Sequence, residues 1–264
     1  MRHLTIKTDE EICCMRRAGH VVEEVLLTMR RLARPGVSTI ELNDIAAEVI
    51  KSHGATASFL GYRGFPYSIC ASVNEEVVHG FSGKRKLRCG DIFSVDVGAV
   101  VDGWHGDAAR TFFIGEVAPE TQKLVRVTRE SFFEGVRFAR PGNRLYDISA
   151  AIQNYAESFG YGVVRALTGH GIGRYMHEEP DIPNFRPTHG GRGLLLKKGM
   201  TLAIEPMINM GTHEVRVLRD GWTVVTDDGK PSAHYENTIA ITDGDPILLT
   251  LSKEEYGPEV ESSA

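Results

Sequence analysis

The sequence predicts an α+β fold built from two similar halves, at about residues 10–115 and 119–248. Two observations predict it. Patterns typical of two helices and then of strands occur in that order twice along the chain. Short motifs of the first half also recur, in the same order, in the second half. We therefore expect a single domain over residues 1–251, followed by a C-terminal tail at 252–264.

Two capping boxes predict the two helices of the first half. Thr8 with Glu11 precedes apolar residues at helical spacing, which continue until a Pro-Gly pair at residues 35–36 ends the helix. Ser38 with Glu41 begins the second helix, which we expect to end near residue 54. The following segment is rich in β-formers and turn residues, which predicts strands.

The second half repeats this order. Pro119 begins a third helix, because proline is favoured at the first helical position, and a Pro-Gly pair at residues 141–142 is expected to end it. A fourth helix is expected over residues 146–159. The remainder, residues 163–251, has the pattern of strands and loops.

An internal repeat is indicated by five short matches between the halves. They are Ala-Arg-Pro-Gly at 33–36 and 139–142, Asp-Ile at 44–45 and 147–148, His-Gly at 79–80 and 170–171, Gly six residues before an acidic residue at 90–96 and 199–205, and His-x-acidic at 105–107 and 234–236. Each match is weak alone. Five matches in one order favour a repeat over the alternative, which is chance with shared loop composition.

The composition excludes several classes of protein. There are 30 basic and 35 acidic residues, the net charge is −5, and the densest basic cluster, residues 84–86, is typical of a solvated turn. No nucleic acid partner is therefore expected. The N-terminus lacks an apolar signal sequence and no stretch approaches the ~18 apolar residues of a membrane helix, so we expect no membrane association. The cysteines have neither disulfide nor zinc spacing, which predicts a cytoplasmic location.

Four carboxylates occupy matched positions of the two halves: Asp96, Asp107, Glu205 and Glu236. All four lie in β-rich runs that are otherwise apolar. A carboxylate on a buried strand is unfavourable unless it is paired or bound to a metal ion. In a net-acidic chain without matched arginines nearby in sequence, this pattern favours metal.

The hairpin formed by residues 92–100 and 104–114 places two of these carboxylates on one face. If the Asp-Gly pair between the runs forms a two-residue turn, Asp96 lies opposite Ala109 and Asp107 is its diagonal neighbour. If the turn falls one residue earlier, Asp96 lies opposite Asp107. Either register predicts Cβ atoms roughly 5–8 Å apart, which suits two groups that share a pair of metal ions.

His170 lies in the glycine-rich segment 168–173, Thr-Gly-His-Gly-Ile-Gly. The glycines allow the backbone to approach another group closely. A histidine flanked by glycines is often only a turn residue. The match between His170-Gly171 and His79-Gly80 favours a functional role.

The chain resembles the methionine aminopeptidase family. The family's metal ligands match Asp96, Asp107, His170, Glu205 and Glu236 in order and spacing, and flanking motifs agree at residues 74–80, 169–173 and 205–206. The resemblance covers about residues 12–251 and is nearest to the short bacterial first type. It implies the pita-bread (creatinase/aminopeptidase) fold, in which two pseudo-symmetric halves enclose a curved antiparallel sheet with helices outside.

The same resemblance implies a two-metal catalytic centre. Asp96 chelates one ion, Asp107 and Glu236 bridge both, and His170 and Glu205 complete the other site. The hard, oxygen-rich donor set suits manganese, iron(II) or cobalt, with zinc as a further alternative. A bridging hydroxide is expected to attack the carbonyl of the first residue, and Glu205 is a candidate to pass a proton to the departing amine.

Further residues have roles only through the resemblance. His79 is expected to contact the scissile amide nitrogen, and His177 to hydrogen-bond the carbonyl oxygen; for His177 the alternative is a surface loop residue. An apolar slot for a thioether is expected from Phe59, Tyr62, Phe65, Cys70, Met176 and Trp222. Core packing is the alternative for each of the six. At positions 59, 65 and 176 the side chains differ from those of well-studied relatives, which concerns the shape of the slot and not the reaction. Carbonyls of Asn74, Glu76 and Ser232 correspond to a monovalent cation site.

The expected activity is removal of the initiator methionine from nascent proteins whose second residue is small. The partner is the nascent polypeptide, met at the ribosome, and the enzyme is expected to be a monomer. Three alternatives stay open: a prolidase or aminopeptidase P, whose usual N-terminal domain has no room before residue 9; a binding module of the same fold, which typically loses the ligands; and a structural cation site, which leaves His79 and His177 unexplained.

Overall fold

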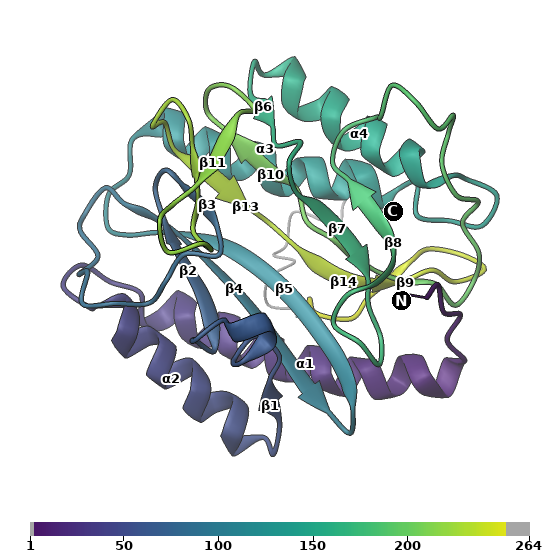
Figure 1. The fold of residues 1–264 in the computed structure, drawn as a ribbon, viewed down its shortest axis with the longest axis horizontal. Helices are drawn as coiled ribbons and strands as arrows, with labels where there is room; N and C mark the ends of the chain where they lie inside the picture. Colours follow the sequence, from purple (N-terminus) through teal and green to yellow (C-terminus); the bar gives the residue numbers. More distant parts are fainter. Residues whose placement is uncertain (1–2, 252–264) are drawn as a thin grey trace.

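The computed structural model describes residues 3–251 (Figure 1). This part of the chain contains four α-helices: α1 (Asp9–Leu32), α2 (Thr39–Ser52), α3 (Pro119–Val136) and α4 (Leu145–Ser158). In Figure 1, α1 and α2 lie along the lower edge and α3 and α4 along the upper edge, with the strands between them. None of these helices is both long enough and apolar enough to cross a membrane.

The helix ends confirm the capping predictions. The Thr8 hydroxyl accepts from the N–H of Glu11 at 3.3 Å, and the Glu11 carboxylate accepts from the N–H of Thr8 at 3.0 Å. The same reciprocal pair joins Ser38 and Glu41 at the start of α2. Each box satisfies two N–H groups that a helix start leaves without intrahelical partners. Pro119 is the first residue of α3, as expected.

The strands form antiparallel sheets on which the helices pack. Their bounds are β1 (Thr56–Ala57), β2 (Ile69–Val73), β3 (Glu76–Val78), β4 (Ile92–Val101), β5 (Trp104–Phe113), β6 (Gly162–Val163), β7 (Thr168–Gly171), β8 (Glu178–Pro183), β9 (Thr201–Ile204), β10 (Met207–Asn209), β11 (Val215–Val217), β12 (Val224–Thr226), β13 (Ser232–His234), β14 (Asn237–Ala240) and β15 (Ile247–Leu248). The larger sheets have the orders β1-β4-β2, with β5 on β4, and β15-β14-β9-β7-β8. Two smaller ones have the orders β13-β10-β6 and β11-β12-β3.

The central hairpin has the first of the two predicted registers. Val101 pairs with Trp104, so that Asp96 lies opposite Ala109 and Gly98 lies opposite Asp107. Asp102 and Gly103, the two turn residues, have φ of 51° and 75°. A two-residue turn of this kind needs positive φ at both positions, which Asp-Gly tolerates.

Two apolar clusters hold the helices to the sheets. One joins α1 and α2 to β2 and β4, with Leu26, Phe93 and Val97 fully or almost fully buried. The other joins α3 and α4 to β9 and β14, with Phe132 and Leu202 among its buried residues. Burial of one such side chain contributes roughly 1.5–3 kcal/mol, so each cluster contributes a large share of the folding free energy.

Hydroxyl groups join β5 to the segment that contains β13 and β14. The Thr238 hydroxyl accepts from the N–H of Asp107 at 3.0 Å and donates to the carbonyl of Asp107 at 2.9 Å. The same pair of bonds occurs in the opposite direction, from β5 to His234. The Thr111 hydroxyl accepts from the N–H of His234 at 3.0 Å and donates to the carbonyl of His234 at 2.9 Å. Strand β5 of the first half and strands β13 and β14 of the second half are thereby held side by side at the centre of the molecule (Figure 1).

Candidate metal centre

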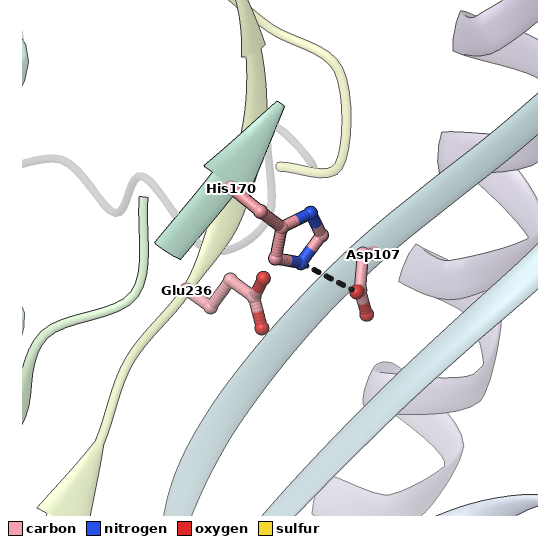
Figure 2. Close-up of side chains that lie close together, drawn as sticks. All are labelled: Asp107, His170 and Glu236. Carbon is pink, nitrogen blue, oxygen red and sulfur yellow. Dashed lines mark ion pairs between the residues drawn. The ribbon is translucent and has the colours of Figure 1, made fainter. Parts of the chain in front are cut away.

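The five side chains expected as metal ligands line one cavity of about 150 Å³. Asp96 comes from β4, Asp107 from β5 and His170 from β7, while Glu205 directly follows β9 and Glu236 directly precedes β14. Figure 2 shows Asp107, His170 and Glu236 pointing toward one another, and one donor atom of each lies within 4.8 Å of the other two. His170 Nε2 lies 3.7 Å from Asp107 Oδ2 and 3.7 Å from Glu205 Oε1.

The four carboxylates are held in an environment that disfavours their charge. Burial, together with the neighbouring carboxylates, raises the pKa of Asp96, Glu205 and Glu236 well above the ordinary range. Burial also raises the pKa of Asp107 to about 8. Like charges this close are unfavourable without a cation to neutralise them.

Unpartnered oxygen atoms indicate where a cation fits. Within residues 3–251, Oδ1 of Asp96, Oδ1 of Asp107 and Oε1 of Glu236 are buried without a hydrogen-bond partner. A buried polar atom in that state is unfavourable by several kcal/mol in order of magnitude, so native proteins rarely leave one unexplained. The donor set, four carboxylates and one imidazole, fits divalent cations.

Arg110 corrects the statement that the carboxylates have no matched arginine nearby in sequence. It follows Asp107 by three residues on β5 and is buried, but strand alternation directs its side chain to the opposite face. The guanidinium donates to the carbonyl of Glu236 at 2.6 Å and to Asn237 Oδ1 at 2.8 Å, and it lies 4.3 Å from the centroid of the Tyr235 ring. Arg110 therefore fixes the backbone that carries Glu236.

His79 and His177 line the same cavity as the carboxylates. His79 has φ of 58° and packs edge-on against Trp222, with ring centroids 6.2 Å apart. Burial lowers the pKa of His79, which favours the neutral imidazole. His177 Nδ1 lies 2.8 Å from the Tyr62 hydroxyl, and the His177 ring centroid is 4.2 Å from that of His170.

One wall of the cavity is apolar and contains all six residues expected to form the slot: Phe59, Tyr62, Phe65, Cys70, Met176 and Trp222. They also form one packing cluster, to which Tyr67 and Phe81 belong. Arg63 lines the cavity as well, although sequence analysis did not select it. The unusual feature of Arg63 is its positive φ of 51°, in a glycine-rich stretch. Nothing in the sequence indicates that backbone angle directly.

Asn74, Glu76 and Ser232, the expected monovalent cation site, lie outside this cavity. Ser232 and Asn74 are in contact, because the N–H of Ser232 donates to the carbonyl of Asn74 at 2.9 Å. Glu76 follows Asn74 by two residues and pairs with Val225 of β12. Asn74 has φ of 58°, and the Glu76 carboxylate accepts from the N–H of Val73 at 2.7 Å.

The two histidines of the His-x-acidic repeat were not selected from the sequence as site residues. His234 Nε2 lies 3.8 Å from Glu205 Oε2 and 3.9 Å from Glu236 Oε2, and burial lowers the pKa of His234 to about 3. His105 Nδ1 lies 2.9 Å from the Ser58 hydroxyl, and burial lowers its pKa to about 4. The repeat itself is the signal that could have identified both residues.

Comparison with known proteins shows the family of this chain. Residues 13–243 match the metallopeptidase family M24, so the chain belongs to that family. A methionine aminopeptidase of Clostridium acetobutylicum is 56% identical over 250 residues, which are 94% of this chain and 99% of that protein. Within the family, the chain groups with short bacterial methionine aminopeptidases. Like them, it is a metallo-exopeptidase, which is a class of hydrolase.

Solved structures agree with the fold expected from the resemblance. The crystal structure of a methionine aminopeptidase from Thermotoga maritima superposes with a TM-score of 0.91 at 46% identity, covering 94% of this chain and all of that one (100%). A prolidase from Pyrococcus furiosus superposes with a TM-score of 0.76 at 21% identity, covering 94% of this chain and 66% of that one. The second likeness shows a common fold alone. The prediction of a pita-bread α+β fold is confirmed.

Proposed function

We propose that this chain removes the N-terminal methionine of polypeptides whose second residue is small. The observation that supports the proposal most is the set of buried carboxylate oxygens without partners, which face His170 across a cavity with one apolar wall. Relatives at up to 56% identity carry the name methionine aminopeptidase. The same site then serves both as metal centre and as methionine pocket.

Two divalent cations per chain are part of the proposal. Asp96 would hold one ion, Asp107 and Glu236 would lie between the two, and His170 with Glu205 would hold the other. When bound, such a pair supplies a water molecule of lowered pKa and polarises the scissile carbonyl. The donor set fits manganese, iron(II), cobalt or zinc, and a monovalent cation at Asn74, Glu76 and Ser232 is a further part of the proposal.

The chain's own groups would bind the substrate and handle protons. The neutral imidazole of His79 would contact the scissile amide nitrogen. His177, whose Nδ1 is engaged by Tyr62, would use Nε2 to donate to the carbonyl oxygen as negative charge develops there. Glu205 would carry a proton to the departing amine.

The apolar wall explains a preference for methionine. Phe65 and Trp222 pack edge-on with ring centroids 5.1 Å apart, and Met176 and Cys70 are buried beside them. An unbranched thioether side chain fits an aromatic and sulfur-containing slot of this kind. We further propose that the substrates are nascent chains near the ribosome, in the cytoplasm, and that the enzyme acts as a monomer.

A peptide panel and metal reconstitution test this function. Protein stripped of metal with a chelator should cleave Met-Ala-Ser only after manganese, cobalt, iron(II) or zinc is added back. It should leave Ala-Pro-Ala intact and cleave Met-Arg-Ser poorly. Anomalous scattering from manganese-soaked crystals should show two ions among the five ligands. Cleavage of Ala-Pro-Ala in preference to Met-Ala-Ser, or inactivity with all four cations, would overturn the proposal.

A further inference from the structure

The N-terminal segment 3–8 lies against the turn that carries two residues of the site. Leu4 forms a parallel bridge with Glu179, and the N–H of Glu179 donates to the carbonyl of His3 at 3.4 Å. The N–H of Lys7 donates to the carbonyl of Gly199 at 2.7 Å. The segment is therefore tied to the second half of the chain before α1 begins.

A buried ion pair lies at the centre of this contact. Lys7 Nζ and Glu178 Oε2 are 2.6 Å apart, and their side chains are only 3% and 2% exposed. Glu178 also accepts from the Thr5 hydroxyl at 2.5 Å and, through its other oxygen, from the N–H of Tyr175 at 3.2 Å. The carboxylate thus links the N-terminal segment to the backbone of the neighbouring turn.

That turn, residues 173–177, ends in Met176 and His177, which both line the catalytic cavity. The ion pair packs directly beneath it, since a Cβ atom on Gly173 would lie 2.5 Å from Lys7 Cε and 2.6 Å from Glu178 Oε1. Gly173 is the last glycine of the Gly-His-Gly-Ile-Gly segment, so its lack of a side chain has a packing reason. Glu178 directly follows His177 in the chain, so the contacts that hold Glu178 also restrict the backbone of His177.

We propose that Lys7 and Glu178 are positioning residues for His177. The ion pair sets the turn so that His177 Nδ1 reaches the Tyr62 hydroxyl at 2.8 Å, which orients the rest of the imidazole toward the cavity. The segment 3–8 is then part of the catalytic architecture, although none of its residues lines the metal cavity. This inference rests on the proposed role of His177 in the reaction.

A double-mutant cycle with His177 separates positioning from simple anchoring. In the manganese-loaded enzyme, Lys7→Met should lower kcat for Met-Ala-Ser by about 10- to 100-fold, because a displacement near 1 Å can cost that much, and change KM less than about threefold. In the His177→Ala background the same substitution should change kcat less than about twofold, because the group that it positions is gone. Lys7→Arg, which keeps the charge, should recover part of the loss.

Two further variants keep the test decisive. Thr5→Val removes one donor to Glu178 while the ion pair stays, so it should give a smaller, about two- to fivefold, loss of kcat that also vanishes in the His177→Ala background. It serves in place of Lys7→Met if that variant does not fold. Arg16→Met is the matched control: Arg16 pairs with Glu23 at 2.6 Å and donates to the Leu249 carbonyl, so its loss should lower the melting temperature and leave kcat unchanged.

The outcomes separate this inference from the function on which it rests. A strong loss in His177→Ala together with an unchanged kcat in Lys7→Met overturns the positioning role alone. Equal fractional losses from Lys7→Met in both backgrounds also overturn it, because they mean that Lys7 does not act through His177. An unchanged kcat in His177→Ala instead removes the proposed role of His177 itself.

Discussion

Ala109 and Glu236 exchange two backbone hydrogen bonds, in which the N–H of Glu236 donates to Ala109 at 3.0 Å and the N–H of Ala109 donates to Glu236 at 3.4 Å. Ala109 lies opposite Asp96 in the hairpin and two residues after Asp107 on the same strand. This pair therefore brings a carboxylate of the second half beside two of the first. The cluster of side chains proposed to hold metal is complete only when the two halves are docked.

Thr238 gives a direct test of this junction. Thr238→Val removes the hydroxyl that bonds both the N–H and the carbonyl of Asp107. Each buried group left without a partner costs about 1–3 kcal/mol, so we expect a melting temperature lower by several degrees and weaker manganese binding. Thermal unfolding and metal titration measure both effects.

The matched control is Thr242→Val, since the Thr242 hydroxyl donates to the carbonyl of Asp245 at 2.7 Å in an exposed turn. It should leave manganese affinity unchanged. Equal metal affinity in the Thr238 variant and the wild type would contradict the importance of the junction.

The hairpin shows what sequence alone can predict. Period-two alternation and an Asp-Gly turn are local features, and they limited Asp96 and Asp107 to one face with two possible registers. The capping boxes were correct for the same reason. Local rules decide local structure when the residues that interact are a few positions apart.

The contacts that assemble the site could not be predicted in this way. The hydrogen bonds of Ala109 with Glu236 join residues far apart in sequence, and Lys7 and Glu178 are separated by 171 positions. No periodicity connects such residues. The four carboxylates expected as ligands were selected from the internal repeat, and the family resemblance supplied the complete expected set with His170. Arg110 was missed because it fixes Glu236 from the far face of β5.

Removal of metal should make the stability of the protein depend on pH. Burial raises the folded-state pKa of Asp107 to about 8 and that of Asp96, Glu205 and Glu236 well above ordinary values. In metal-free protein these four groups hold more protons in the folded state than in the unfolded state above about pH 4, which makes stability fall as pH rises toward about 8. Burial lowers the pKa of His79, His105 and His234, which acts in the opposite direction below about pH 6.5, so the fall is expected above that pH. Metal binding should displace the carboxyl protons.

Two measurements check this linkage. The melting temperature of metal-free protein should decrease from about pH 6.5 to pH 8, and saturating manganese should remove most of that decrease. Calorimetric titration with manganese at pH 7 should give heats that differ between buffers of different ionisation enthalpy. Heats that are the same in every buffer would mean that no protons leave and that the carboxylates are already ionised.

His79→Ala should separate catalysis from metal binding. His79 lines the cavity as a neutral imidazole but is not among the expected ligands, so the variant should bind the same number of manganese ions as the wild type. Loss of a proton-handling group at the scissile amide should lower kcat about 10²- to 10⁴-fold. The control is His53→Ala, an exposed histidine at the end of α2 that contacts the carbonyl of Val49. A variant at residue 79 that loses metal together with activity would place His79 among the ligands instead.

Phe65→Ala tests whether the apolar wall selects methionine. Phe65 is 3% exposed, and its ring packs edge-on against Trp222 and Phe81 at centroid distances of 5.1 Å and 5.6 Å. Truncation should cost about 3–5 kcal/mol of stability and leave a larger slot that holds a thioether less closely.

We expect kcat/KM for Met-Ala-Ser to fall about 10- to 200-fold, as for other mismatches in apolar pockets, while the activity toward Phe-Ala-Ser relative to Met-Ala-Ser rises. The control is Phe138→Ala, a residue that is 40% exposed and does not line the cavity. Because Phe65 also supports neighbouring rings, a loss of activity alone is ambiguous, and the ratio between the two peptides decides. If that ratio stays at its wild-type value in folded Phe65→Ala protein, Phe65 serves packing alone and another wall residue selects the methionine side chain.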